Sequence, residues 1–355
     1  MARLPDRPPA LTPPPAKFTP YAAARALPNI VVDGAPLPTT LLTLSHWPNN
    51  KSPRALRRDT STATAFAYLD AVPLHQAVPW VTNNHFDEDG LFSMYAVCEP
   101  ERALLRRDLL TAASFAGDFG VVTGRDAARL CFVIENLCDP DASILPADTF
   151  EEKDRVAALY TAMLDALPAL LRDCGDGWPR YGDLWALQDE HLTASQALLT
   201  DGVVTVAEQP QLDLAVVRIP AHLRRRQVRR YLEDEFAAVH PFAVNSATAC
   251  TRILRVQGNH YEFEYRYESW VQLATRRVPL RVHLGGLATR LNELEKGSPG
   301  WAAQDATDVV PRLTRTDGTP STIPLETFLL ELENALVSAP VAWDPYDWKT
   351  TGGAE

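Results

Sequence analysis

The sequence lacks the features that mark membrane-spanning, exported and disulfide-stabilised proteins. None of its windows approaches the roughly 18 uncharged apolar residues of a membrane-spanning helix, and its N-terminus has no apolar run of signal-peptide length. Its five cysteines are odd in number, scattered and without a C-x-x-C pair, which favours buried thiols in a reducing compartment over a disulfide framework or a zinc knuckle. We therefore expect a cytoplasmic protein with no membrane partner.

Several catalytic signatures are also missing. The chain has no H-E-x-x-H, no Gly-x-Ser-x-Gly, no Walker loop and no Gly-x-Gly-x-x-Gly. These absences argue against a zincin, a serine hydrolase of the nucleophile-elbow type, a P-loop nucleoside triphosphatase and a dinucleotide-dependent dehydrogenase.

What is present is an ordinary globular composition with an acidic balance. The 355 residues are 46% hydrophobic and 22% charged, enough for a sizeable core and roughly two domains. With 34 basic and 45 acidic residues the formal charge is −11, which argues against nucleic acid as a partner. Arginines gather between residues 218 and 290, so the charge is compatible with a small anionic substrate; the oligomeric state stays open, a homodimer included.

The first half of the chain predicts a parallel α/β domain. Ten of the 29 prolines fall before residue 39, which predicts an irregular arm over residues 1–38. Strands are expected at 41–45 and 80–82, each followed by a helix, at 55–70 and from 91. Helical periodicity dominates from there to about 199, so we place this domain at 39–205.

The second half predicts a smaller α+β domain over residues 206–336, followed by an irregular tail over 337–355. A strand is expected at 214–219 and a charged helix at 221–238, where dense arginines precede three acidic residues and pair with them within the helix. Residues 261–268 alternate aromatic and charged side chains, as a strand does. An antiparallel neighbour, expected at 278–284, completes a hairpin.

The most informative segment is Asn83-Asn84-His85-Phe86-Asp87-Glu88-Asp89-Gly90. His85, Asp87 and Asp89 share one parity, so an extended strand end projects all three to the same side. In open α/β sheets ligands bind at the carboxyl ends of strands, and an imidazole with two carboxylates is a ligand set for Mn²⁺, Mg²⁺, Fe²⁺ or Zn²⁺. An EF-hand loop starting at His85 fails, because its bidentate acid falls on Ala96. The alternative is structural: Asp89 caps the following helix.

The pattern His-x-Asp-x-Asp-Gly after a buried strand, with Ser93 in the following helix, resembles a metal-binding motif of the DHH phosphoesterase superfamily. Upstream, His46, Asn49 and Asp59 resemble the same motif in the pyrophosphatases of that family. The chain has no Asp-His-His triplet, and Asp118, between Gly117 and Gly120, is the candidate for the isolated acid of the second motif. The motif is equally compatible with an uncharacterised bacterial family that shares only this strand.

This resemblance implies a manganese- or magnesium-dependent hydrolase of phosphate esters or phosphoanhydrides, acting in a cleft between the two domains. Its catalytic residues would be His85, Asp87 and Asp89, with His46, Asp59 and Asp118 as further metal ligands. The planar fork of arginine suits a phosphate clamp, for which the candidates are Arg252, Arg255, Arg266, Arg276, Arg277, Arg281 and His283. Two other functions stay open: a metalloenzyme of another class on the same ligands, and a non-catalytic binding or scaffold protein.

Overall fold

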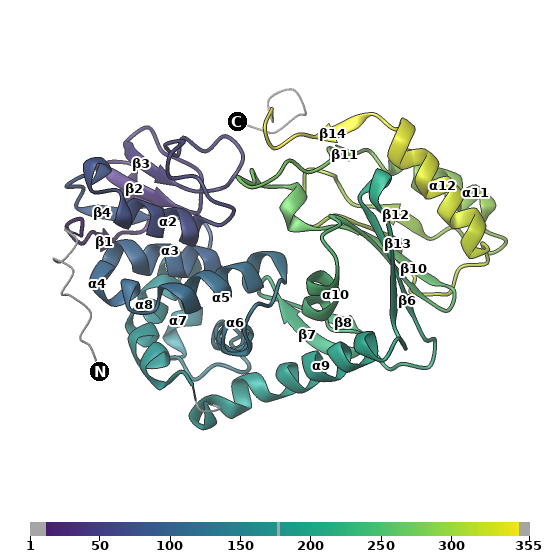
Figure 1. The fold of residues 1–355 in the computed structure, drawn as a ribbon, viewed down its shortest axis with the longest axis horizontal. Coiled ribbons are helices and arrows are strands. Elements are labelled where there is room, and N and C mark those ends of the chain that lie inside the picture. The colour runs from purple at the N-terminus through teal and green to yellow at the C-terminus, as the bar shows by residue number, and fades with distance from the viewer. Residues whose placement is uncertain (1–11, 176–177, 348–355) are drawn as a thin grey trace, which may run out of the picture. The chain divides into compact units, whose positions relative to one another are not determined.

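The structure, a computed structural model, describes residues 12–175 and 178–347, and these form two compact units (Figure 1). Unit 1 comprises residues up to His46 together with Asn50–Gly117 and Gly124–Gly182, and unit 2 comprises Trp47–Asn49, Asp118–Thr123 and the chain from Asp183 onward. The outermost parts of the predicted arm and tail, residues 1–11 and 348–355, lie outside the described residues.

The sheet of unit 1 is parallel throughout. Its strands are β1 (Lys17–Phe18), β2 (Asn29–Val32), β3 (Thr40–Leu44) and β4 (Trp80–Thr82), in the spatial order β1-β4-β2-β3. All four residues of β2 are buried between β4 and β3. The prediction of an irregular arm up to residue 38 is therefore wrong for this segment, because the apolar run of β2 outweighs the prolines on either side of it.

Helices α2 (Ser61–Asp70) and α3 (Glu88–Cys98) pack against each other and against these strands (Figure 1). Helix α2 begins later than expected because Thr60 is its N-cap and accepts a hydrogen bond from Ala63 N. The chain preceding α8 also contains α1 (Tyr21–Ala24), α4 (Pro100–Leu104), α5 (Arg107–Phe119), α6 (Arg125–Leu137) and α7 (Asp148–Glu151), and α8 is Arg155–Asp173. Short 3₁₀ turns lie at Val72–Leu74, Pro179–Tyr181, Pro210–Leu212 and Tyr267–Ser269.

Unit 2 is built on a six-stranded sheet in the order β12-β13-β10-β9-β6-β5. The aromatic side chains on one face of β10 (His260–Tyr265) pack with α11 (Gly285–Leu294) and α12 (Leu325–Ser338) into a continuous apolar core. The strands are β5 (Thr205–Gln209), β6 (Leu214–Ile219), β9 (Arg252–Gln257), β10 (His260–Tyr265), β12 (Trp301–Ala303) and β13 (Arg312–Arg315). The helices are α9 (Gly182–Thr200), α10 (Pro241–Ala247), α11 (Gly285–Leu294) and α12 (Leu325–Ser338).

The charged helix expected at 221–238 is a β-hairpin instead. Strands β7 (Arg226–Arg230) and β8 (Glu233–Ala237) are joined by Tyr231 and Leu232, both with positive φ (56° and 60°). The arginines that seemed to pair with acids along one helix face those acids across the hairpin, with Arg229 opposite Asp234. Opposite charges satisfy both patterns, so charge spacing alone did not separate helix from hairpin.

The expected antiparallel neighbour of β10 is also different. Strand β11 (Arg281–Val282) pairs with β14 (Val341–Trp343), within the predicted irregular tail. Both edges of β10 are already taken, by β9 and by β13.

At the level of fold class the structure confirms the prediction of an α/β chain whose parallel sheet comes first and whose antiparallel pairs follow. Within the described ranges, no helix combines the length and the apolar character that crossing a lipid bilayer demands.

Candidate metal centre

Three loops of unit 1 bring carboxylates and imidazoles together. Asp33 directly follows β2, His46 lies two residues past β3, and the segment from Asn83 to Asp89 follows β4. Because β2, β3 and β4 are parallel, these loops leave the same edge of the sheet, where ligands bind in open α/β folds.

Asp33 lies at the centre of the cluster. It is 1% exposed and has φ 45°, a left-handed conformation that aspartate tolerates better than most residues. Its Oδ1 lies 3.4 Å from His46 Nε2 and its Oδ2 lies 3.2 Å from His85 Nε2. Ser61 Oγ donates a hydrogen bond to Oδ1 at 2.7 Å, whereas Oδ2 accepts none from the described residues. One carboxylate therefore faces two imidazoles, one on each oxygen.

Two sets of three ligand atoms result, and both include Asp33. Asp33, His46 and Asp89 form one set, and all three are buried. Asp33, His85 and Asp87 form the other. Within each set, all ligand atoms lie within 4.8 Å of one another, a spacing at which one cation can contact all three groups.

The orientation of His46 is fixed by the loop before α2. Its Nδ1 lies 2.5 Å from the backbone carbonyl of Asp59, and since a carbonyl oxygen only accepts, Nδ1 carries the proton. The lone pair of Nε2 is then directed toward Asp33 and Asp89. Metal-ligating histidines are held in this way by a backbone carbonyl on the other ring nitrogen. Asp59, expected as a ligand itself, contacts His46 through its main chain, and its carboxylate belongs to neither set.

The two remaining acids also hold helix ends. Asp89 accepts hydrogen bonds from Ser61 N at 2.6 Å and Thr62 N at 2.8 Å, at the start of α2. Asp87, rather than Asp89, is the N-cap of α3 and accepts from Gly90 N at 2.7 Å. Capping thus explains part of this cluster, but it uses neither Asp33 nor the imidazoles. Each carboxylate oxygen keeps a second lone pair for a cation.

Two glycines let these loops approach closely. A Cβ on Gly34 would lie 2.4 Å from the Oδ1 atoms of both Asn83 and Asn84, and one on Gly90 would lie 2.4 Å from Tyr160 Oη. Asn83 Nδ2 donates to that same oxygen at 2.8 Å. Because Tyr160 belongs to α8, this hydrogen bond fixes the loop after β4 to that helix. A side chain at either glycine would displace these side chains, which form hydrogen bonds within and between the loops that carry the candidate ligands.

Burial and the proximity of several carboxylates shift the pKa values of the acids and histidines in the cluster. Burial, then the nearby Asp87 and Asp89 carboxylates, raise the pKa of Asp33 well above its usual value. Burial opposes a charge on His85, but the carboxylates of Asp87 and Asp33 raise its pKa to about 10. Burial lowers the pKa of His46. In the metal-free protein the imidazolium of His85 supplies the positive charge that offsets neighbouring carboxylates, and a cation bound at Nε2 would take the place of that proton.

The other expected ligand, Asp118, belongs to unit 2. There its backbone carbonyl accepts a hydrogen bond from Tyr231 Oη at 2.7 Å. Neither ligand set includes it.

The arginines expected to clamp a phosphate are mostly internal cross-links of unit 2. Arg252 donates to Leu212 O and Leu280 O, and Arg266 to Thr248 O and Phe119 O. Arg281 donates to carbonyls of a neighbouring loop, Ala306 O and Val309 O. Arg255 forms ion pairs with Glu262 and Glu264. These donors are already engaged within their own unit.

The remaining candidates are exposed. Arg277 lies over the ring of Tyr346 at 4.6 Å, and His283 donates its backbone N–H to Pro340 O. Arg276 accepts a hydrogen bond from Tyr346 Oη through its carbonyl. The two arginines thus share Tyr346, Arg276 only through its backbone, and His283 makes a separate backbone contact.

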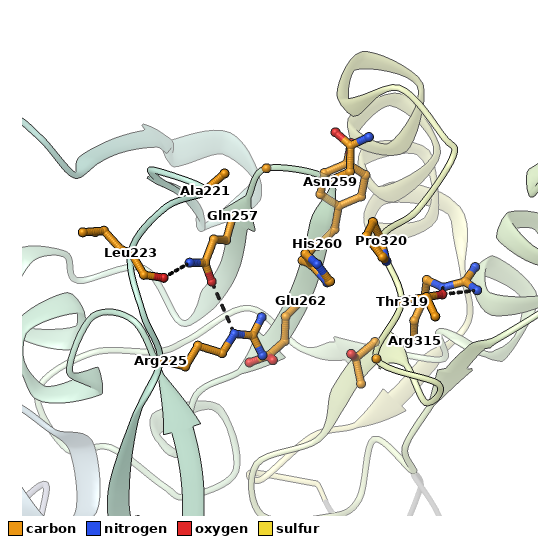
Figure 2. A pocket seen from close by; sticks show the side chains of 14 residues that line it. Ala221, Leu223, Arg225, Gln257, Asn259, His260, Glu262, Arg315, Thr319 and Pro320 are labelled. Carbon is orange, nitrogen blue, oxygen red and sulfur yellow. Dashed lines mark hydrogen bonds between the residues drawn. The ribbon is translucent and has the colours of Figure 1, made fainter.

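Unit 2 has a cavity of about 750 Å³ at the β9–β10 turn (Figure 2). Its polar groups are largely satisfied by one another. Gln257 donates to Leu223 O and accepts from Arg225 Nε, and Arg315 donates to Thr319 Oγ1. Among the described residues that line it, no three acids or histidines meet as they do in unit 1, so the Asp33 cluster is the candidate site.

Sequence reasoning missed the central residue, Asp33, although a signal was present. Ile30-Val31-Val32 is an apolar run that ends in Asp33-Gly34, the same strand-then-acid pattern that drew attention to Asp87 and Asp89. Asp33 fell inside the stretch assigned to an irregular arm. Ser61, which donates to Asp33, carried no separate signal.

Comparison with known proteins identifies the family. Residues 14–347 match the family described as Family of unknown function (DUF6687), and the chain belongs to it. No curated protein and no solved structure matches the chain. The resemblance to the DHH phosphoesterase superfamily is corrected by this finding: it rested on short motifs, whereas a different family accounts for nearly the whole chain.

Proposed function

We propose that this protein binds divalent cations, Mn²⁺ or Mg²⁺, at the Asp33 cluster and uses them to hydrolyse a phosphate ester or phosphoanhydride of a small anionic substrate. One observation carries the proposal: two buried or half-buried ligand sets share the Asp33 carboxylate. Two-metal hydrolytic sites place their cations about 3.5–4 Å apart, a separation that a shared carboxylate can span.

The ligand set suits hard or borderline cations. It consists of carboxylate oxygens and imidazole nitrogens with no thiolate, the combination that favours Mg²⁺ or Mn²⁺ over soft metals. A buried carboxylate oxygen that accepts no hydrogen bond from the described residues, Asp33 Oδ2, fits the same interpretation. His85 Nε2 contacts that oxygen at 3.2 Å in the metal-free protein, so a bound cation would replace the imidazolium proton at this contact.

Bound cations of this kind polarise a phosphoryl oxygen and lower the pKa of bound water. Hydrogen bonds within unit 1 orient the side chains that would hold the cations. His46 presents Nε2 because Asp59 O holds its other nitrogen, and the α2 amides fix the rotamer of Asp89. Asp33 is held by Ser61. The ligands are therefore oriented before a substrate arrives, which lowers the cost of binding.

Metal binding is tested first. Purified protein is stripped with a chelator and titrated with Mn²⁺ by calorimetry, and its thermal unfolding is measured with and without the metal. We expect saturable binding and a raised unfolding temperature in the wild type and in Asp108→Asn, an exposed acid of α5 that serves as the control. Both effects should be smaller in His85→Ala, Asp87→Ala, which removes two ligands of one set and leaves Asp33, His46 and Asp89 in place. Equal stabilisation of this double variant and the wild type would overturn the proposed site.

Hydrolysis is tested separately, on the Mn²⁺-loaded protein. Phosphate release is measured from pyrophosphate, p-nitrophenyl phosphate, bis-p-nitrophenyl phosphate and adenosine 5′-monophosphate. Release that requires Mn²⁺ and is lost in the double variant supports a hydrolase. Metal binding without turnover of any of these phosphates would refute the hydrolase assignment and leave a metal-binding protein.

A further inference from the structure

A second cavity in unit 1, of about 240 Å³, adjoins the loop that carries His85. Asn83 and Asn84 line it, and these two residues immediately precede His85. The opposite walls come from the end of β1, from α1 and the residue that follows it, and from the start of α8, and comprise Phe18, Tyr21, Ala22, Arg25, Asp154, Val156 and Ala157.

Hydrogen bonds join this cavity to the metal centre. Tyr21 Oη donates to Ala35 O at 2.9 Å, and Ala35 N donates to Asn84 Oδ1 at 2.8 Å. Ala35 lies two residues after Asp33, and Asn84 lies next to His85. One wall of the cavity is therefore fixed to both loops that carry ligands of the second set, and a molecule bound in the cavity is held at a constant position relative to Asp33 and His85.

Arg25 is the cation of this cavity. Its guanidinium carbon lies 5.9 Å from the centre of the Tyr21 ring, and the guanidinium donates no hydrogen bond to any described residue. Two other arginines of unit 1, next to Asp59, are engaged: Arg57 donates to Ser52 O, and Arg58 donates to Ala55 O. Arg25 thus has donors to offer a ligand.

The polarity of the cavity is mixed. The Asp154 carboxylate faces the same space as Arg25 and uses one oxygen, Oδ1, to cap α8 through Ala157 N. An acid beside the single arginine disfavours a second phosphate group. A flat heterocycle that carries both donors and acceptors on its edge suits this pair of side chains.

Size and shape favour a single ring system. A volume of 240 Å³ equals that of about eight water molecules at ~30 Å³ each, which is room for one ring system. The Phe18 and Tyr21 side chains line the space, and aromatic side chains of this kind stack on nucleobases. Phe18 is itself held by Tyr160, with ring centres 5.3 Å apart.

We propose that this cavity binds the nucleobase of a nucleotide, so that the phosphate reaches the metal centre and the substrate class is a nucleoside phosphate. The base lies against Phe18 and Tyr21, and its edge meets Arg25 and Asp154. This inference deepens the proposed hydrolase function and rests on it for the identity of the reaction. The binding of the base itself does not depend on the metal.

Binding is therefore tested on metal-free protein. Adenosine and uridine, which lack phosphate, are titrated by ligand-observed NMR, with ribose as the sugar control. We expect at least one nucleoside to bind and ribose not to bind. Tyr21→Ala should weaken that binding roughly 10- to 100-fold, as loss of a stacking side chain does, while Tyr21→Phe and the exposed control Lys17→Ala should keep it within about threefold. Binding of neither nucleoside, or equal binding by Tyr21→Ala, would overturn the inference.

Turnover gives the second readout. If Mn²⁺-dependent hydrolysis is found, kcat/KM for adenosine or uridine 5′-monophosphate should exceed that for ribose 5-phosphate, and Arg25→Ala should remove that preference while sparing ribose 5-phosphate. Equal kcat/KM values for nucleotide and sugar phosphate would overturn the cavity assignment and leave the hydrolase intact. If no phosphate is hydrolysed, the proposed function fails, and nucleoside binding in the metal-free protein still decides the cavity. Circular dichroism of each variant confirms that it is folded.

Discussion

Asp33 Oδ2 and His85 Nε2 meet at 3.2 Å although one residue follows β2 and the other follows β4. The contact exists because β2 and β4 are parallel neighbours, so their carboxyl ends share one edge of the sheet. The same geometry places His46, after β3, on the other oxygen of Asp33. The topology of the sheet thus creates the cluster, and the ligand residues need not be close in sequence.

Asp33→Asn should abolish high-affinity binding of Mn²⁺, because this one substitution removes a charged ligand from both sets. Loss of residues that only support a metal ligand typically costs 10- to 100-fold in affinity, so we expect a loss of more than about 100-fold here. Calorimetric titration measures it, with Asp108→Asn as the matched control. An unchanged affinity would show that Asp33 is not a ligand.

Gly34→Ala should destabilise unit 1 and weaken metal binding together. The new Cβ would lie 2.4 Å from the Oδ1 atoms of Asn83 and Asn84, and relief of such a clash typically costs about 1–3 kcal/mol. Chemical denaturation measures the change in the free energy of unfolding. Gly182→Ala, where the added Cβ meets nothing within 4 Å, is the control and should be neutral or slightly stabilising. Similar behaviour of the two variants would contradict the close approach of the loops.

The acid stability of unit 2 should depend on Glu264. This buried carboxylate accepts hydrogen bonds from Arg255 and Arg312. Burial alone would raise its pKa, but those arginines lower it well below its ordinary value. A lowered pKa in the folded state means that the stabilisation is present above the unfolded pKa of about 4.3 and is lost as the pH falls below it.

Glu264→Gln should therefore flatten the decline in stability below about pH 4.3. At neutral pH it should cost roughly 1.5–3 kcal/mol, because Arg255 and Arg312 each lose one charged partner and keep the other, Glu262 and Glu235 respectively. Thermal unfolding between pH 3 and 7 measures both effects. Asp347→Asn, which changes an exposed acid at the last described residue of unit 2, is the control variant. If the stability of Glu264→Gln falls with decreasing pH as steeply as that of the wild type, Glu264 does not control the acid stability of unit 2.

The thiols should be inert in the folded protein. All five cysteines are free, and three of them are buried. Burial raises the pKa of Cys98 to about 12 and that of Cys174 to about 11, so neither forms appreciable thiolate at pH 8. A thiol reagent such as 5,5′-dithiobis(2-nitrobenzoate) should react slowly with the native chain. After denaturation it should react quickly and modify all five thiols. Fast reaction before unfolding would contradict this burial.

The sequence predicted those parts of the fold whose signal is local. The alternation in β10 and the buried β4 followed by a polar turn and a helix each identify an element within a few residues. His85, Asp87 and Asp89 stood out because one short segment carries all three. The assembly around them required knowledge of which strands are neighbours.

The elements that sequence reasoning missed have competing signals. Strand β2 is short and flanked by prolines, so its burial between two strands is visible only in three dimensions. The β7–β8 hairpin has charges that satisfy a helix and a hairpin alike. The arginines of unit 2 were expected to be free for a ligand, but Arg266 and Arg281 are fully buried donors to backbone carbonyls. Composition cannot distinguish a cation that binds a ligand from one that holds a fold together.

The parallel sheet of unit 1 has a further consequence for how the chain is made. All four of its strands and every residue of both ligand sets lie between Lys17 and Asp89. Chains emerge from the ribosome N-terminus first, and domains generally fold as they appear. The strands and the ligands therefore leave the ribosome before any of α5 to α12, and pairing of β2 with β3 and β4 can bring the ligand loops together during synthesis.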